Sequence, residues 1–195
     1  MIRISAYDLI AALLIGAAVA TGNPASGDFG VAAIILPVLV AGVVLAATGA
    51  GAGASADARA LIALRWVGAA YIAFVLLWYE QYKLTGAEGS VALFTTITDW
   101  LGAHGHEKAM RIGVGSAEIV ASLLILVPRT QWLGALGAVA LMTGALFFHL
   151  ASPLGVDPYG DGAFLFREAC SVWVCGWIVA WWRRDQLLAI IRRVR

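Results

Sequence analysis

Ionisable side chains interrupt the long apolar segments of this sequence. Glu118 lies within the apolar run 111–127, and His149 lies at the end of the run 131–150. Charged groups inside a membrane are costly, so they usually face a protein interior or a polar cavity. Carboxyl and imidazole groups can take up and release protons once burial has adjusted their pKa values. Proton transfer is therefore the chemistry that these residue types favour.

Further polar residues accompany these two. The candidate catalytic residues are Glu118, His149 and Glu168. The candidate ligand-binding residues are Glu80, Lys83, Arg111, Ser122, Met142 and Ser171. If successive apolar runs cross the membrane in alternating directions, the ionisable members of this set lie in its outer half or at its outer edge. We expect them to form one enclosed polar pocket with apolar walls.

Helical spacing places these residues on common faces, because residues three and four apart lie on the same side of a helix. One face of the run 111–127 carries Arg111, Gly115, Glu118 and Ser122. A second face, in the run 163–182, carries Glu168, Ser171 and Cys175. A third, in the run 131–150, carries Ala138, Met142, Ala145 and His149. Close helix contacts are expected at the small residues Gly113, Ala117 and Ala121.

Each candidate also has a purely structural interpretation. Glu118 would pair with Arg111 or with a hydroxyl group on a neighbouring helix. His149 would cap a helix end, and Glu168 would pair with the adjacent Arg167. The sequence leaves both interpretations open.

Composition defines the class of protein. The chain is 62% hydrophobic and 13% charged, whereas soluble domains are roughly 45–50% apolar and about 25% charged. A net charge of +1 without a basic patch argues against nucleic-acid binding. The sequence thus indicates an integral membrane protein that contacts membrane lipid.

Six apolar runs are long enough to cross a bilayer, which takes about 20 residues. They cover residues 6–22, 30–49, 60–79, 111–127, 131–150 and 163–182. We therefore expect an all-α membrane protein with six transmembrane helices. The first run also resembles a signal peptide, because Arg3 precedes it and it ends in Ala18-Val19-Ala20.

The connecting segments divide the chain. We expect an N-terminal transmembrane hairpin at 1–50, a Gly/Ala/Ser-rich linker at 51–59 and a four-helix core at 60–183. Within the core, a short amphipathic helix is expected at about 90–103, with Phe94, Ile97 and Leu101 on its apolar side and Thr95, Thr98 and Asp99 opposite. An ordered loop is the alternative. Residues 184–195 would form a basic cytoplasmic tail.

Orientation follows from the distribution of positive residues. The side that holds both termini collects nine arginines: Arg3, Arg59, Arg65, Arg129, Arg183, Arg184, Arg192, Arg193 and Arg195. The other side holds Lys83, Lys108, Arg111 and Arg167. We expect both termini in the cytoplasm of a bacterium, with the protein in the inner membrane.

Metal and dithiol chemistry have little support in the sequence. His104, Gly105, His106 and Glu107 form H-G-H-E, which is weak evidence for a metal site without further ligands. Cys170 and Cys175 are five residues apart on one predicted helix, which separates their Cα atoms by roughly 8–9 Å and prevents a disulfide. No haem, flavin or iron–sulfur motif is visible. We expect no metal.

Three segments together resemble the DoxX family. Residues 65–83, RWVGAAYIAFVLLWYEQYK, followed by Leu84, are similar to its first helix. Residues 113–149 are similar to its second and third helices, at Gly115, Glu118, Arg129, Met142, Ala145 and His149. GDGAFLFREA is similar to the entry of its fourth helix, with Glu168 as the usual carboxylate. The N-terminal hairpin, Glu80 and a long outer loop depart from the pattern.

The resemblance implies a four-helix membrane core and, for some relatives, a subunit of quinone-linked oxidation. We expect an accessory redox subunit that binds a quinone or a similar amphiphile, with an electron-donating partner protein. Whether the chain is itself an enzyme, a quinone-linked oxidoreductase subunit, stays open. The alternatives are a non-catalytic scaffold or assembly factor, with an assembly partner or a second copy of the chain, and a small proton-coupled transporter.

Overall fold

The computed structural model describes residues 55–186 and 188, and this part of the chain is helical without strands. Its helices are α3 (Ala56–Thr85), α4 (Glu88–Trp100), α5 (Glu107–Leu126), α6 (Gln131–Ala151) and α7 (Phe164–Trp182). The predicted N-terminal hairpin and most of the predicted basic tail lie outside the described residues. The all-α class is therefore confirmed for the described part.

Four of these helices are long and apolar enough to cross a membrane. They comprise Ala60–Thr85 of α3 and the whole of α5, α6 and α7. They coincide with the last four predicted spans, and the two earlier spans fall outside the described residues. Large apolar side chains such as Leu123, Phe147 and Trp181 are exposed on their outer faces. The described part is thus a multi-pass, membrane-embedded bundle.

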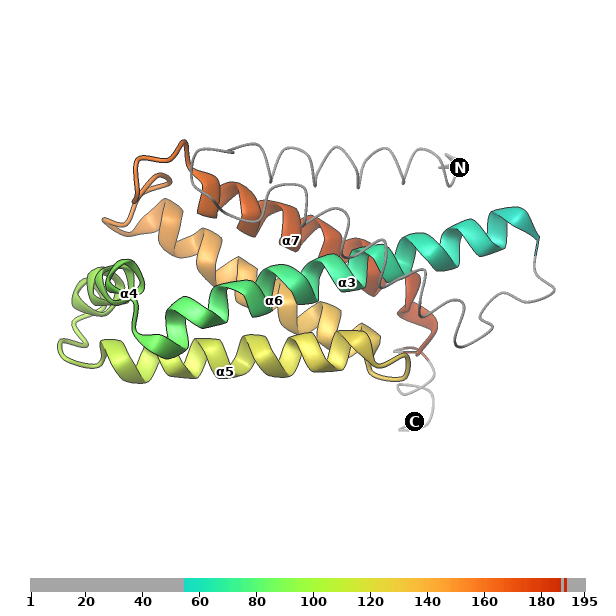
Figure 1. Ribbon diagram of the computed structural model, residues 1–195, viewed down its shortest axis with the longest axis horizontal. Helices are drawn as coiled ribbons and strands as arrows, with labels where there is room; N and C mark the ends of the chain where they lie inside the picture. Colours follow the sequence, from blue (N-terminus) through green and yellow to red (C-terminus); the bar gives the residue numbers. More distant parts are fainter. Residues whose placement is uncertain (1–54, 187, 189–195) are drawn as a thin grey trace.

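The four long helices form a closed ring, and α4 lies across one end of it (Figure 1). Contacts are most extensive between α6 and α7, α3 and α5, and α5 and α6, while α3 and α7 complete the ring. Fully buried side chains from three of these helices, Ile72, Ile125 and Val172, fill its centre. This arrangement brings α3 and α7 together although they are far apart in the chain.

Glycines set the closest helix contacts. At Gly134 of α6, a Cβ atom would collide with the backbone of Ile125 on α5. Close backbone approach of this kind stabilises helix pairs in a membrane, where apolar burial alone gives little driving force. The prediction that Gly113 and Ala117 serve this purpose is wrong, because both are exposed. Ala121 is buried as expected.

Helix α3 is longer than its apolar run. It begins at Ala56, where the Ser55 hydroxyl accepts the N–H of Ala58, and it ends at Thr85 before Gly86. Gly86 has a φ of 72°, which a glycine adopts without strain. The expectation that this span ends at Glu80 is therefore wrong. Glu80 and Lys83 lie one turn apart on the same helix.

Helix α4 lies where the short amphipathic helix is predicted. Phe94 and Ile97 are buried, as the pattern predicts. Thr98, expected on the polar side, is instead buried, and its hydroxyl donates to the carbonyl of Phe94. Leu101, expected on the apolar side, is exposed. A hydroxyl can be buried here because the helix backbone itself supplies its partner.

Candidate functional site

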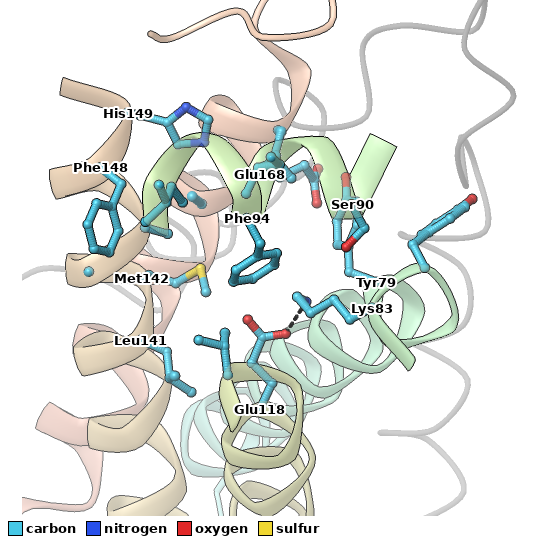
Figure 2. Close-up of a pocket in the computed structure, with 18 of the residues that line it drawn as sticks. Tyr79, Lys83, Ser90, Phe94, Glu118, Leu141, Met142, Phe148, His149 and Glu168 are labelled. Carbon is cyan, nitrogen blue, oxygen red and sulfur yellow. Dashed lines mark hydrogen bonds and ion pairs between the residues drawn. The ribbon is translucent and has the colours of Figure 1, made fainter. Parts of the chain in front are cut away.

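A cavity of about 760 Å³ lies beneath α4. Its walls come from every described helix and from the loop between α6 and α7, and they are mostly apolar. Figure 2 shows Phe94 pointing down from α4, Met142 entering from α6 and Glu118 rising from α5. Ligand sites in proteins are typically apolar cavities of about 300–1,000 Å³ with a few placed polar groups. This cavity has that character.

Glu118 is paired with Lys83 at the cavity wall (Figure 2). The Lys83 Nζ atom donates to Glu118 Oε2 at 2.5 Å, and it also lies 3.2 Å from Glu80 Oε1. Glu118 is only 4% exposed. A buried carboxylate needs a partner charge because its loss of hydration is otherwise uncompensated. The three residues form a cluster of two carboxylates and one ammonium, defined here as the Lys83 cluster.

Gly115 makes room for one of these carboxylates. It lies on the predicted buried face of α5, one turn before Glu118, and it packs against the Glu80 side chain of α3. A Cβ atom at Gly115 would collide with the Glu80 carboxylate. All four residues that the spacing places on this face, Arg111, Gly115, Glu118 and Ser122, are buried. The predicted face is therefore confirmed.

Arg111 supports the cluster from outside the cavity. Its guanidinium donates to the backbone carbonyl of Lys83 and to the carboxylate of Glu107 on the same helix. The last carbonyls of a helix lack partners within the helix, and a cation there also interacts favourably with the helix dipole. Arg111 thus fixes the end of α3, and with it the backbone position of Lys83.

His149 lines another part of the cavity and is held by the loop that follows α6. Its Nδ1 atom lies 2.6 Å from the carbonyl oxygen of Gly155. A carbonyl oxygen can only accept, so Nδ1 carries the hydrogen, and Nε2 of the neutral ring is an acceptor. The edge of the ring packs against Phe166. This contact between His149 and Gly155 was not predicted from the sequence.

Glu168 completes the acidic character of the cavity. It lies in the first turns of α7, is 1% exposed and lines the cavity. Its neighbour on the predicted face, Ser171, donates to the Glu168 carbonyl and bonds to the hydroxyl of Tyr71 at 2.5 Å. Glu168 and Cys175 are both buried on this face, with Ser171 partly buried between them. The hydroxyl pair ties α7 to α3 beside the cavity.

The loop between α6 and α7 closes the cavity against α4. The Tyr159 hydroxyl donates to the carbonyl of Gly89 at 3.1 Å. Burial, and secondarily the charge of Asp161, raise the pKa of Tyr159, which keeps this donor protonated. Backbone N–H groups of the loop, chiefly that of Ala163 and then those of Asp161 and Gly162, hold the pKa of Asp157 below its ordinary value.

The predicted site residues divide into two groups. Those that line the cavity are Lys83, Glu118, Met142, His149 and Glu168. Those that do not line it are Glu80, Arg111, Ser122 and Ser171. Glu80 and Arg111 contact Lys83, and the Ser122 hydroxyl donates to the carbonyl of Glu118. These contacts support the lining residues, and ligand binding by Glu80, Arg111, Ser122 and Ser171 stays a prediction.

Several lining residues were missed. Tyr79 is the last residue of the predicted run 60–79, and Tyr82 lies in the unexpected last turn of α3. Ser90 comes from the start of α4, and Tyr159 comes from the loop between α6 and α7. The amphipathic pattern pointed to Phe94 but gave no sign that it faces a cavity. Tyr159 stands in a turn-rich segment without periodicity, so no pattern marks it.

Metal ligands are not assembled in the part of the chain that the structure describes. His104 is exposed and lies 2.8 Å from Asp99. Cys170 and Cys175 are both free. Comparison with models of known protein families, with characterised proteins and with solved structures finds no match to this chain.

Proposed function

We propose that this is a DoxX-like membrane protein that binds a quinone or a similar amphiphile in the cavity, as an accessory subunit of a quinone-linked oxidation. The supporting observation is a mostly apolar cavity of about 760 Å³. Its polar lining includes the Lys83–Glu118 ion pair, His149 and Glu168. A quinone, when bound, supplies a carrier that takes up electrons together with protons. Electrons would come from a partner protein.

The residues present fit such a ligand. The apolar side chains around Phe94, Leu141 and Met142 suit a ring and its hydrocarbon tail. The Lys83 ammonium can donate to a ring oxygen, and His149 Nε2 can accept from a ring hydroxyl. A ligand with both an apolar body and oxygen atoms would satisfy both parts of the wall.

The acidic residues of the cavity would take up and release protons. Glu118 and Glu168 are enclosed carboxyl groups, and each can hold or release a proton at a carboxylate oxygen. Lys83 orients the Glu118 carboxylate, and Gly155 orients the His149 ring. The mostly apolar walls beneath α4 would strengthen the electrostatic interactions of these groups with a bound head group.

The test is binding of decylubiquinone to the full-length protein in nanodiscs, followed by tryptophan fluorescence. Glu118→Gln keeps the shape of the side chain but removes its charge and its ion pair with Lys83, and we expect about tenfold weaker binding or more. Glu88→Gln is the matched control, because Glu88 is exposed at the start of α4, and it should bind as wild type does. Absence of wild-type binding, or equal binding by both variants, would favour a scaffold instead.

The finer topology is also part of the proposal. Six spans in a bacterial inner membrane, with both termini in the cytoplasm, follow from the apolar runs and from the excess of arginine on one side. A reporter fused to the C-terminus that is active only in the cytoplasm should be active. A periplasmic signal would reject this orientation.

A further inference from the structure

The end of the bundle opposite α4 contains a second polar cluster. Here α6 begins and α7 ends, beside the turn that joins α5 to α6 (Figure 1). The Nε atom of Arg183, just after α7, donates to Gln131 Oε1 at 2.7 Å. Gln131 is the first residue of α6 and is fully buried, with 0% exposure. A buried amide thus holds one arginine in place.

A second arginine lies next to the first. Helices α3 and α7 touch at Gly68, whose added Cβ atom would lie 3.2 Å from Val179 Cγ2. Arg65 lies three residues before Gly68, and Arg183 lies four residues after Val179. Because the two helices run in opposite directions, both arginines lie one turn further toward the same end, and their charges interact. The cluster formed by Arg65, Gln131 and Arg183 is defined here as the arginine cluster.

Hydrogen-bond donors outnumber acceptors in the arginine cluster. Arg65 Nε and Gln131 Nε2 are buried donor atoms without a partner in the described part of the chain. The first N–H groups of α6 are not capped by a side chain, and the Thr130 hydroxyl donates to the Leu124 carbonyl. One buried acceptor nearby, Gln186 Oε1, also lacks a partner. Among the buried side-chain atoms at this end of the described bundle, two donors and one acceptor therefore lack a partner.

No carboxylate in the described part of the chain is paired with these charges. Among the described residues, neither Arg65 nor Arg183 forms an ion pair with an Asp or Glu side chain. Arg183 is partly buried, and this burial lowers the pKa of its guanidinium from the ordinary value. Two neighbouring guanidinium groups without an anion repel each other and lose hydration. An acceptor-rich anion would remove both costs.

We propose that the arginine cluster and the start of α6 bind a phosphate-bearing anion. Guanidinium groups bind phosphate oxygens through several parallel hydrogen bonds, and a helix N-terminus favours negative charge. The anion is the head group of an acidic phospholipid or free inorganic phosphate, which share this chemistry. The site is separate from the cavity and does not depend on the function proposed for it.

The experiment measures binding to the full-length protein in detergent by native mass spectrometry. Three probes are titrated: short-chain phosphatidylglycerol, phosphatidylcholine with the same chains, and inorganic phosphate. We expect phosphatidylglycerol to bind about tenfold more tightly than phosphatidylcholine or better, because only the former carries a net negative charge. If inorganic phosphate binds and displaces phosphatidylglycerol, the ligand is free phosphate. If it does neither, the ligand is the lipid.

The variants locate the site. Arg65→Gln and Arg183→Gln should each weaken the preferred probe by about tenfold or more. Arg184→Gln is the matched control, because Arg184 is exposed and stacks on Trp181 outside the cluster, and it should leave affinity unchanged. Arg65→Lys replaces Arg65→Gln in the experiment if the latter fails to fold. It keeps the charge but loses the planar guanidinium, so its affinity should lie between that of wild type and that of Arg183→Gln.

Three results would overturn the proposal: no binding of either anion, equal binding of both lipids, or equal affinities in the Arg65, Arg183 and Arg184 variants.

Discussion

The two ends of the bundle differ in how their buried charged groups are paired. At the cavity end, Lys83 lies between Glu80 and Glu118, and Arg111 is paired with Glu107. At the other end, Arg65 and Arg183 lie one turn beyond the contact of Gly68 with Val179, and Arg183 donates to the neutral Gln131. The ammonium of the Lys83 cluster is paired with two carboxylates, whereas the arginine cluster has unpartnered side-chain donors among the described residues.

This difference separates the ligands that each end suits. An internally paired site can accept a neutral amphiphile without leaving an ion exposed to the membrane interior. A surplus of donors instead requires an anion, which the surrounding lipid or the solvent must supply. The distribution of partners, rather than the number of charges, therefore distinguishes the two ends.

The largest loss of stability is expected from removing the Lys83 ammonium, which Glu80 and Glu118 share. Lys83→Met leaves two buried carboxylates without a counter-charge, and removing one partner from a buried pair typically costs about 3–5 kcal/mol. We expect a loss of that size in the free energy of unfolding, measured by chemical denaturation in mixed micelles. Lys108→Met is the control, because Lys108 is exposed.

The same measurement on Arg65→Gln in neutral detergent should give a much smaller loss, because that change also relieves repulsion from Arg183. Similar losses for Lys83→Met and Arg65→Gln would mean that the two ends do not differ in charge compensation.

A smaller effect is expected from closing the space that Glu80 occupies. Gly115→Ala places a methyl group against the Glu80 carboxylate, the end of a side chain that is held by Lys83. Overpacking typically costs about 1–3 kcal/mol, and a gain in helix propensity of roughly 0.5–1 kcal/mol offsets part of this cost. Gly113→Ala is a matched control on the same helix, because its Cβ would meet nothing within 4 Å. It should be stabilising by roughly 0.5–1 kcal/mol, through helix propensity. Equal thermal stability of the two variants would contradict this packing.

The smallest effect concerns pH and the loop that closes the cavity. Asp157 has a pKa below its ordinary value of 3.8 in the folded protein, chiefly because backbone N–H groups donate to it. A depressed pKa adds stability above the unfolded value, and this contribution is lost as pH falls through the folded value. Asp157→Asn should therefore melt at a lower temperature than wild type at neutral pH, and the gap should shrink below about pH 3.8. A difference in melting temperature that does not change with pH would show that the Asp157 charge does not stabilise the loop.

The sequence predicted the helices of the described core and most of their buried faces. Periodicity alone identified the face of α5 that carries Gly115 and Glu118, because a buried helix face repeats every three to four residues. The pairing of Glu118 with Lys83 was not predicted. It depends on α3 continuing past Glu80, which the loss of apolar character at that point concealed.

Contacts between distant segments could not be read from local patterns. Tyr159 meets Gly89 across 70 residues, and Arg183 meets Gln131 across 52. Neither pair has a spacing or composition that marks it, since both arise only when the ring of helices closes. The arginine bias at the same end was visible, but as a signal of orientation and not as a cluster.

The two acceptors around Lys83 have a mechanical consequence. Arg111 anchors the backbone of Lys83, so its ammonium moves only by rotating its own side-chain bonds. An incoming head group that occupied the Glu118 carboxylate would leave the ammonium on Glu80, 3.2 Å away. The ammonium would thus keep one carboxylate partner while the other carboxylate turns to the bound molecule.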